Sequence, residues 1–348
     1  MNEETARQCL DVILGEALAR KASDVHLACG QPPLVRVDGD MVRLEQPPCD
    51  APMLDALMDV LLQGGPHREA WGSGADCDAA LTWANRLRVR VNAYRTLDGA
   101  CAALRLIPLD VPEWSSLGVP EKLMTLTQRR QGLILIAGPT GSGKSTTLAA
   151  LVQHLHQTQA GHILTIEDPI EFVHGPGRGL ISQREVGLHT PDFASALRMA
   201  LRETPDVIVI GDMRDRTTFS QALRAAETGH LVLGTLHAPS AARTVDRILD
   251  AFEGAERSSA ALSLSGCLSA ILVQRLVRRK GGGRVALHEL LLATPAVRSM
   301  IRDSHVAQLP AAIETGRSVG MQSIAEAAAR LVANGTLDMA TAQMVNGA

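Results

Sequence analysis

The stretch Gly132-Leu-Ile-Leu-Ile-Ala-Gly-Pro-Thr-Gly-Ser-Gly-Lys-Ser-Thr146 decides the fold class of this chain. A short apolar run comes first, and residues 138–145 then match the pattern G-x-x-x-x-G-K-[ST]. Such a loop binds nucleotide phosphates when a strand precedes it and a helix begins inside it. Both conditions are met here, so the stretch predicts a P-loop in an α/β domain.

The residue types in this loop suit a triphosphate and its metal. Glycines allow consecutive backbone N–H groups to turn inward around phosphate oxygens. Lys144 is expected to reach the β and γ phosphates as a point charge, and Ser145 to give an oxygen to magnesium. The predicted cofactors are therefore ATP and Mg²⁺. The predicted binding residues are Gly138, Pro139, Thr140, Gly141, Ser142, Gly143, Lys144, Ser145 and Thr146.

Acidic residues follow two of the predicted strands. Glu167 and Asp168 come after the apolar run 162–166, and Asp212 comes after the run 206–211. A P-loop needs carboxylates at such strand ends, to hold magnesium directly or through water and to orient the attacking water. Ser145, Glu167 and Asp212 are therefore the candidate metal-binding residues, and Lys144, Glu167 and Asp212 are candidate catalytic residues.

A third strand, within 229–236, has a histidine near each end. The separation of His230 and His237 is odd, so a regular strand would point them to opposite faces and they are not expected to share a metal. An isolated histidine most often has a structural role. His237 follows the carboxyl end of its strand, where it can sense the γ-phosphate, and it is a further catalytic candidate.

The order of predicted elements indicates two domains. Residues 1–110 read as a small α/β unit, with a helix over 5–21 and strands over 24–27, 34–37, 41–44, 86–94 and 102–107. Residues 111–120 contain prolines and Gly118 and are expected to form a linker. In 121–348, strands over 133–137, 162–166, 207–210 and 230–235 alternate with helices over 144–158, 193–203, 217–228 and 241–251. This alternation predicts a mainly parallel sheet covered on both faces, and 255–348 is expected to be mostly helical.

Composition excludes several classes of protein. Aromatic residues make up 2% and the net charge is −3, which argues against a nucleic-acid partner. None of the 6 cysteines stands in a Cys-x-x-Cys pair, so no zinc site is expected. The N-terminus reads as an amphipathic helix and no apolar run is long enough to span a bilayer, which predicts a cytoplasmic protein.

With these motifs laid out, the chain resembles the hexameric secretion and type IV pilus ATPases, and within them the pilus-retraction, or twitching-motility, type. The P-loop, the segment 163–174, the segment 205–215 and the segment 228–237 resemble the family's P-loop, aspartate box, Walker B segment and histidine box. The segments 22–27 and 35–39 resemble its N-terminal domain. The segments 296–303 and 315–322 resemble its C-terminal motifs.

The resemblance implies a PAS-like N-terminal domain, a RecA-like ATPase domain and a homo-hexamer that hydrolyses ATP. It implies an inner-membrane pilus platform protein as partner, with a paralogous retraction ATPase as a further one, and peripheral association with the inner membrane through the pilus machine. Arg90 and Arg105 match arginines that approach the γ-phosphate in the family, and Arg95 is a further candidate by proximity alone.

Three positions depart from the family pattern. Asp212 and Thr217 stand where relatives usually carry glutamate, and Asp98 stands where they carry arginine. The aspartate side chain is shorter than that of glutamate and reaches less far toward metal and water. The rate of ATP hydrolysis is therefore the property that these departures affect. They leave open a non-hydrolysing accessory subunit that binds nucleotide.

Two further alternatives share the same ATPase core. A pilus-extension or type II secretion ATPase is less favoured, because those relatives usually carry an additional N-terminal domain and a four-cysteine zinc element. A nucleic-acid translocase is disfavoured by the charge and the scarcity of aromatic residues.

Overall fold

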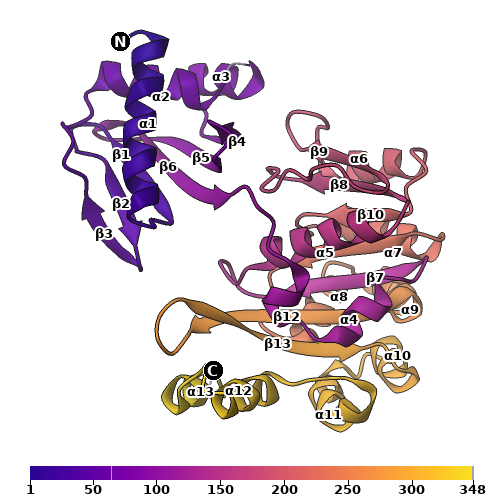
Figure 1. The fold of residues 1–348 in the computed structure, drawn as a ribbon. Helices are drawn as coiled ribbons and strands as arrows, with labels where there is room; N and C mark the ends of the chain where they lie inside the picture. Colours follow the sequence, from indigo (N-terminus) through magenta and orange to yellow (C-terminus); the bar gives the residue numbers. More distant parts are fainter. Residues whose placement is uncertain (64, 347–348) are drawn as a thin grey trace. The chain divides into compact units, whose positions relative to one another are not determined.

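The computed structural model describes residues 1–63 and 65–346. The chain forms two compact units (Figure 1). Unit 1 consists of Met1–Asp110 and Pro169–Val173, and unit 2 consists of Val111–Asp168 and the described residues from His174 onward. No helix in the described part of the chain is long and apolar enough to cross a membrane.

Unit 1 is built on a six-stranded antiparallel sheet with the order β3-β2-β1-β6-β5-β4. Residues along β4 alternate between buried and more exposed, as expected for a sheet with one face against a core. That core is aliphatic and includes the buried faces of α1 and α2, which contact each other. The elements are α1 (Glu3–Ala19), β1 (Asp24–Ala28), β2 (Leu34–Val37), β3 (Asp40–Arg43), α2 (Ala51–Leu61), α3 (Gly65–Gly72), β4 (Cys77–Trp83), β5 (Leu87–Thr96) and β6 (Gly99–Pro108).

Unit 2 is built on a seven-stranded sheet with the order β13-β12-β7-β11-β10-β8-β9. All neighbouring pairs are parallel except β12 and β13. Every residue of β7, β10 and β11 is buried, so both faces of the sheet are covered, as predicted. The strands are β7 (Gly132–Ala137), β8 (His162–Glu167), β9 (Leu180–Glu185), β10 (Val207–Ile210), β11 (Leu231–Leu236), β12 (Leu268–Arg278) and β13 (Arg284–Leu292).

The helices of unit 2 fill the connections between these strands and the C-terminal region. Those that follow β7, β9, β10 and β11 begin within two residues of the predicted positions. They are α4 (Glu121–Leu126), α5 (Lys144–Thr158), α6 (Phe193–Ala200), α7 (Arg216–Glu227), α8 (Ala241–Leu249), α9 (Gly254–Cys267), α10 (Pro295–Arg302), α11 (Leu309–Thr315), α12 (Ile324–Ala333) and α13 (Met339–Asn346), with short 3-10 turns at Trp114–Leu117, Val306–Gln308 and Gly316–Val319.

The prediction that 255–348 is mostly helical is wrong for residues 268–292. There the chain forms the antiparallel pair β12 and β13, and β12 lies between β13 and β7 in the sheet. The first seven residues of β12 are buried, so they show no alternation of polar and apolar residues. A short apolar run of this kind does not distinguish a buried strand from a buried helix, and the neighbouring strand β7 decides between them.

The segment Pro169–Val173 leaves unit 2 after Asp168 and belongs to unit 1, although the predicted second domain spans 121–348. Within unit 1 it is held by two arginines of β5. Arg88 Nε donates to the carbonyl oxygen of Ile170 at 3.0 Å, and Arg90 Nη1 lies 3.3 Å from Glu171 Oε1.

Arg95 packs against a tryptophan of its own unit. Its guanidinium carbon lies 3.7 Å from the ring centroid of Trp71, and its Nη2 donates to the Trp71 carbonyl oxygen at 2.8 Å. These contacts give Arg95 a structural part in unit 1.

We therefore predict that Arg95→Ala lowers the free energy of unfolding of unit 1 by about 1 kcal/mol, because it removes a cation–π contact and a charged hydrogen bond. Chemical denaturation followed by tryptophan fluorescence measures this, and Arg95→Lys should lose less than Arg95→Ala. An unchanged denaturation midpoint together with a lower rate of ATP hydrolysis would contradict this assignment.

Candidate nucleotide-binding site

The site forms where four parallel strands of unit 2 end. Ala137 pairs with Leu236, Gly234 pairs with Ile210, and Ile210 pairs with Ile166. The residues that follow these strands therefore meet at one edge of the sheet, where ligands bind in open α/β folds. This register brings the loop after β7, Glu167, Asp212 and His237 into one region.

The loop between β7 and α5 has the backbone of a phosphate cradle. Gly138, Gly141 and Gly143 have φ of 152°, 74° and 86°, which only glycine adopts without strain. A Cβ on Gly138 would collide with the carbonyl oxygen of Gln274 and with Ser142 Oγ. Gly143 is the N-cap of α5 and provides no side-chain cap, so the first N–H groups of a long helix face the loop and favour an anion there.

Gln274 of β12 holds this loop by hydrogen bonds to the loop and to the start of α5. Its Nε2 donates to the Ser142 carbonyl oxygen at 2.7 Å, and its Oε1 accepts from Thr147 Oγ1 at 2.7 Å. Gln274 is 3% exposed, so both bonds are shielded from water. Gln274 is not among the site residues predicted from the sequence. A polar residue directly after the apolar run 270–273 is the signal that marks it.

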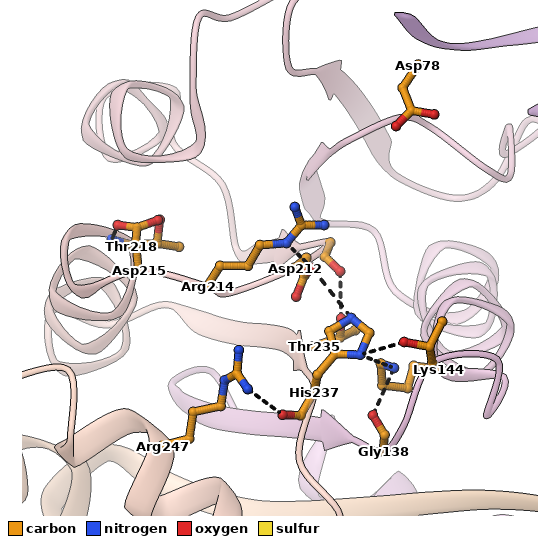
Figure 2. A network of polar contacts seen from close by, with 12 residues as sticks. Asp78, Gly138, Lys144, Asp212, Arg214, Asp215, Thr218, Thr235, His237 and Arg247 are labelled. Atoms are coloured by element: carbon orange, nitrogen blue, oxygen red, sulfur yellow. Dashed lines mark hydrogen bonds and ion pairs between the residues drawn. The ribbon is translucent and has the colours of Figure 1, made fainter. Parts of the chain in front are cut away.

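Lys144 and His237 meet beside the loop (Figure 2). Lys144 Nζ donates to the carbonyl oxygens of Gly138 at 3.0 Å and Pro139 at 2.9 Å, and it lies 3.4 Å from His237 Nδ1. Burial first, and then the positive charge of Lys144, lowers the pKa of His237, while Asp212 raises it. The imidazole is therefore neutral at neutral pH and can take part in hydrogen bonding next to the loop.

Asp212 provides the carboxylate that faces this group. Its Oδ2 accepts from Arg214 Nε at 2.5 Å and lies 3.7 Å from His237 Nε2 (Figure 2). Its Oδ1 is buried and has no hydrogen-bond partner among the described residues. A buried carboxylate oxygen in this position fits a magnesium ion or a water bound to it.

The donor set suits magnesium. Ser145 is exposed in the first turn of α5, Glu167 is the last residue of β8, and Asp212 follows the neighbouring strand β10. Magnesium is usually bound by one or two carboxylates together with substrate phosphates. Within residues 1–63 and 65–346, no group of three or more histidines, cysteines and carboxylates could hold a metal by itself. These residues therefore fit an ion that binds together with a nucleotide.

Glu167 ends β8, next to the start of the Asp212 loop. Gly211 N donates to the Ile166 carbonyl oxygen at 2.8 Å, and a Cβ on Gly211 would lie 3.2 Å from Glu167 Cα. Glu167 Oε1 accepts from Thr165 Oγ1 at 2.6 Å and from Gln183 Nε2 at 3.1 Å. The carboxylate is thus held at the sheet edge by two donors, a suitable position for orienting a water.

One predicted histidine lies at the other end of its strand, and the two predicted arginines belong to unit 1. His230 precedes β11 at the opposite edge of the sheet, where its Nδ1 lies 3.2 Å from the Ala225 carbonyl oxygen, so it does not join His237. Arg90 and Arg105 belong to unit 1, with Arg90 near Glu171 and Asp78 and Arg105 Nε 3.2 Å from Asp24 Oδ1. Their role toward phosphate stays a prediction.

Comparison with known proteins identifies the family. A model of the type II/IV secretion system protein family matches residues 2–281. The chain belongs to this family. Type IV pilus retraction ATPase PilT of Pseudomonas aeruginosa PAO1 is 44% identical over 331 residues, which cover 95% of this chain and 96% of that protein. A twitching motility protein of Neisseria gonorrhoeae is 44% identical over 306 residues, which cover 88% of this chain and 82% of that protein.

A solved member of the family also matches the fold. The crystal structure of the pilus retraction motor PilT with bound ADP aligns with a TM-score of 0.86 and 40% identity, covering 96% of this chain and 95% of that chain. The predicted fold class, a PAS-like α/β unit followed by a RecA-like P-loop ATPase unit with a mainly parallel sheet, is confirmed. The resemblance to this ATPase family is confirmed as well.

The support that Gln274 gives to the loop can be tested directly. We predict that Gln274→Leu raises the dissociation constant for ADP by about tenfold, because the Ser142 carbonyl and the Thr147 hydroxyl each lose a buried partner. Titration calorimetry measures this change. Gln322→Leu is the matched control, since Gln322 Nε2 donates to the His288 carbonyl oxygen in another part of unit 2. Equal affinity in Gln274→Leu and wild type would contradict the supporting role.

Proposed function

We propose that this protein is an ATPase motor that hydrolyses ATP to drive the retraction of type IV pili. The observation that carries the proposal is the network of Lys144, His237 and Asp212 beside a glycine loop that ends at an uncapped helix. Similarity to a retraction ATPase over nearly the full length of both chains supports the specific kind of work.

The geometry supports a division of roles among the site residues. Lys144 neutralises phosphate charge at the loop, and Ser145 contributes an oxygen to magnesium. Asp212 supports the metal, through a bound water because its side chain is short. Glu167 orients or deprotonates the attacking water. Magnesium, when bound, polarises the phosphate oxygens and offsets their charge.

Three further residues are assigned by analogy with this mechanism. Arg90 and Arg105 stabilise the charge that develops on the transferred phosphoryl group, as arginine fingers do. His237, which contacts both Lys144 and Asp212, responds to the presence of the γ-phosphate.

The working assembly in this proposal is a homo-hexamer in the cytoplasm, attached to an inner-membrane pilus platform protein. Alternating closure of the two units would convert hydrolysis into displacement of that platform. A paralogous retraction ATPase is a further partner. Magnesium binding, assembly into a hexamer and contact with a platform protein are proposed here on the basis of similarity to the family.

A second candidate function rests on Asp212. Because aspartate is one methylene shorter than glutamate, this chain can bind nucleotide with slow turnover and regulate another motor. Release of phosphate by the purified assembly under steady-state conditions distinguishes a motor from such a subunit.

Hydrolysis at this site is tested by two substitutions. Lys144→Ala should abolish hydrolysis and most nucleotide affinity, because the phosphates lose their buried cation. Glu167→Gln should keep ATP bound while turnover falls by about 10²- to 10⁴-fold, as expected when a general base is lost. A phosphate-release assay and calorimetry measure these effects, with Lys122→Ala, an exposed lysine of α4, as control. Wild-type turnover in Lys144→Ala would remove the loop from the mechanism.

The direction of pilus movement is tested in cells. Deletion of the gene should leave excess surface pili that do not retract, because assembly continues without disassembly. Electron microscopy of sheared and intact cells counts the pili. Cells without pili would instead support the extension motor, and an unchanged count would point to a secretion system of another kind.

A further inference from the structure

Two side chains converge on one oxygen of Glu167. Thr165 Oγ1 lies 2.6 Å from Glu167 Oε1, and Gln183 Nε2 lies 3.1 Å from the same atom. Gln183 pairs with Thr165 in the parallel register of β8 and β9, so both project from the same face as Glu167. Thr165 is 1% exposed, and Gln183 is partly buried on the edge strand.

The orientation of the Gln183 amide is fixed from both ends. Its Nε2 donates to the carboxylate, and its Oε1 accepts the backbone N–H of His174 at 3.1 Å. A flipped amide would place an oxygen against the carboxylate and an NH₂ group against an N–H, so only one orientation satisfies both partners. His174 is itself placed by α5, since its Nδ1 lies 2.8 Å from Gln153 Oε1.

Gln183 thereby connects the two points at which the chain leaves unit 2 and returns to it. Glu167 lies just before the segment Pro169–Val173, which belongs to unit 1, and His174 is the first residue back in unit 2. One amide contacts the side chain before the excursion and the backbone after it. Both polar atoms of the Gln183 side chain thus bond to protein groups, one on each side of the segment 169–173.

We propose that Gln183 is a positioning residue for the hydrolytic step: it holds the carboxylate of Glu167 in the orientation needed to direct water. This rests on the role of Glu167 proposed above. The phosphate loop lies elsewhere in the sheet, because β11, β10 and β8 separate β7 from β9. Loss of the Gln183 amide therefore lowers kcat and leaves nucleotide binding in place.

The test compares variants that keep the length of the side chain. Gln183→Met removes the donor and the acceptor, and Gln183→Glu keeps the shape but places a second carboxylate against Glu167. The expected result for each is a fall in kcat of about 10- to 100-fold, the effect of a misplaced catalytic group, with the KM for ATP within about twofold of wild type. Steady-state phosphate release on the assembled protein provides both constants.

Ser182→Ala is the matched control on the same strand. Ser182 Oγ lies 3.0 Å from His162 Nε2, on the opposite face from Gln183. This variant should retain wild-type kcat. Thermal unfolding and ADP affinity of every variant are measured in parallel, because a merely structural role of Gln183 would lower stability and affinity together with kcat.

A double-mutant cycle identifies the residue through which Gln183 acts. In the Glu167→Gln background, Gln183→Met should leave the residual single-turnover rate unchanged, since the group it positions is already gone. If the rate losses of Gln183→Met and Glu167→Gln multiply in the double mutant, the two residues act independently and the proposal is overturned. Wild-type kcat in both Gln183→Met and Gln183→Glu would overturn it as well.

The outcomes separate this inference from the function on which it rests. An inactive Glu167→Gln with fully active Gln183 variants removes the positioning role and leaves the ATPase mechanism standing. A fully active Glu167→Gln overturns both the base role of Glu167 and the positioning role of Gln183.

Discussion

The parallel register of β7, β11, β10 and β8 determines which side chains meet at the site. It brings the glycine loop, His237, Asp212 and Glu167 to one edge of a sheet whose central strands are entirely buried. Both faces of the central strands are covered, so a shift of one residue would exchange the side chains that pack against the two covering layers and disrupt the core on each side. The geometry of the site is therefore a consequence of the packing of aliphatic side chains.

Electrostatics explain why this edge suits a triphosphate. Lys144 is 8% exposed, and its ammonium is directed to two backbone carbonyls and a neutral imidazole. These three neighbours carry no negative charge, whereas phosphate oxygens do. Asp212 keeps one buried oxygen without a partner in the described structure, which a hydrated magnesium ion would satisfy. The loop thus favours the phosphate anion, and the carboxylate after β10 favours the magnesium ion that accompanies it.

Much of this site could be predicted from the sequence, because P-loop residues and acidic strand ends are short-range signals. Gln274 and Gln183 could not be predicted. Gln274 reaches Ser142 only because β12 lies beside β7, and the run that contains it reads as helix. Gln183 lies on the edge strand β9, which has no clear alternation, and it reaches Glu167 only through the pairing of β8 and β9. Both contacts join segments that are separated in sequence, and patterns within one segment do not encode them.

The same limit applies to Arg95, whose contact with Trp71 depends on how α3 packs in unit 1.

We propose that the triphosphate lies in the loop from Gly138 to Thr146, with its metal toward Asp212. A crystal of the assembled protein soaked with magnesium and a slowly hydrolysed ATP analogue tests this most directly. We expect phosphate density against the backbone N–H groups of the loop and beside Lys144, with a metal ion between Ser145 and the strand end that carries Asp212. Nucleotide density at another place, or a loop without nucleotide density at a saturating concentration of the analogue, would rule out this binding site.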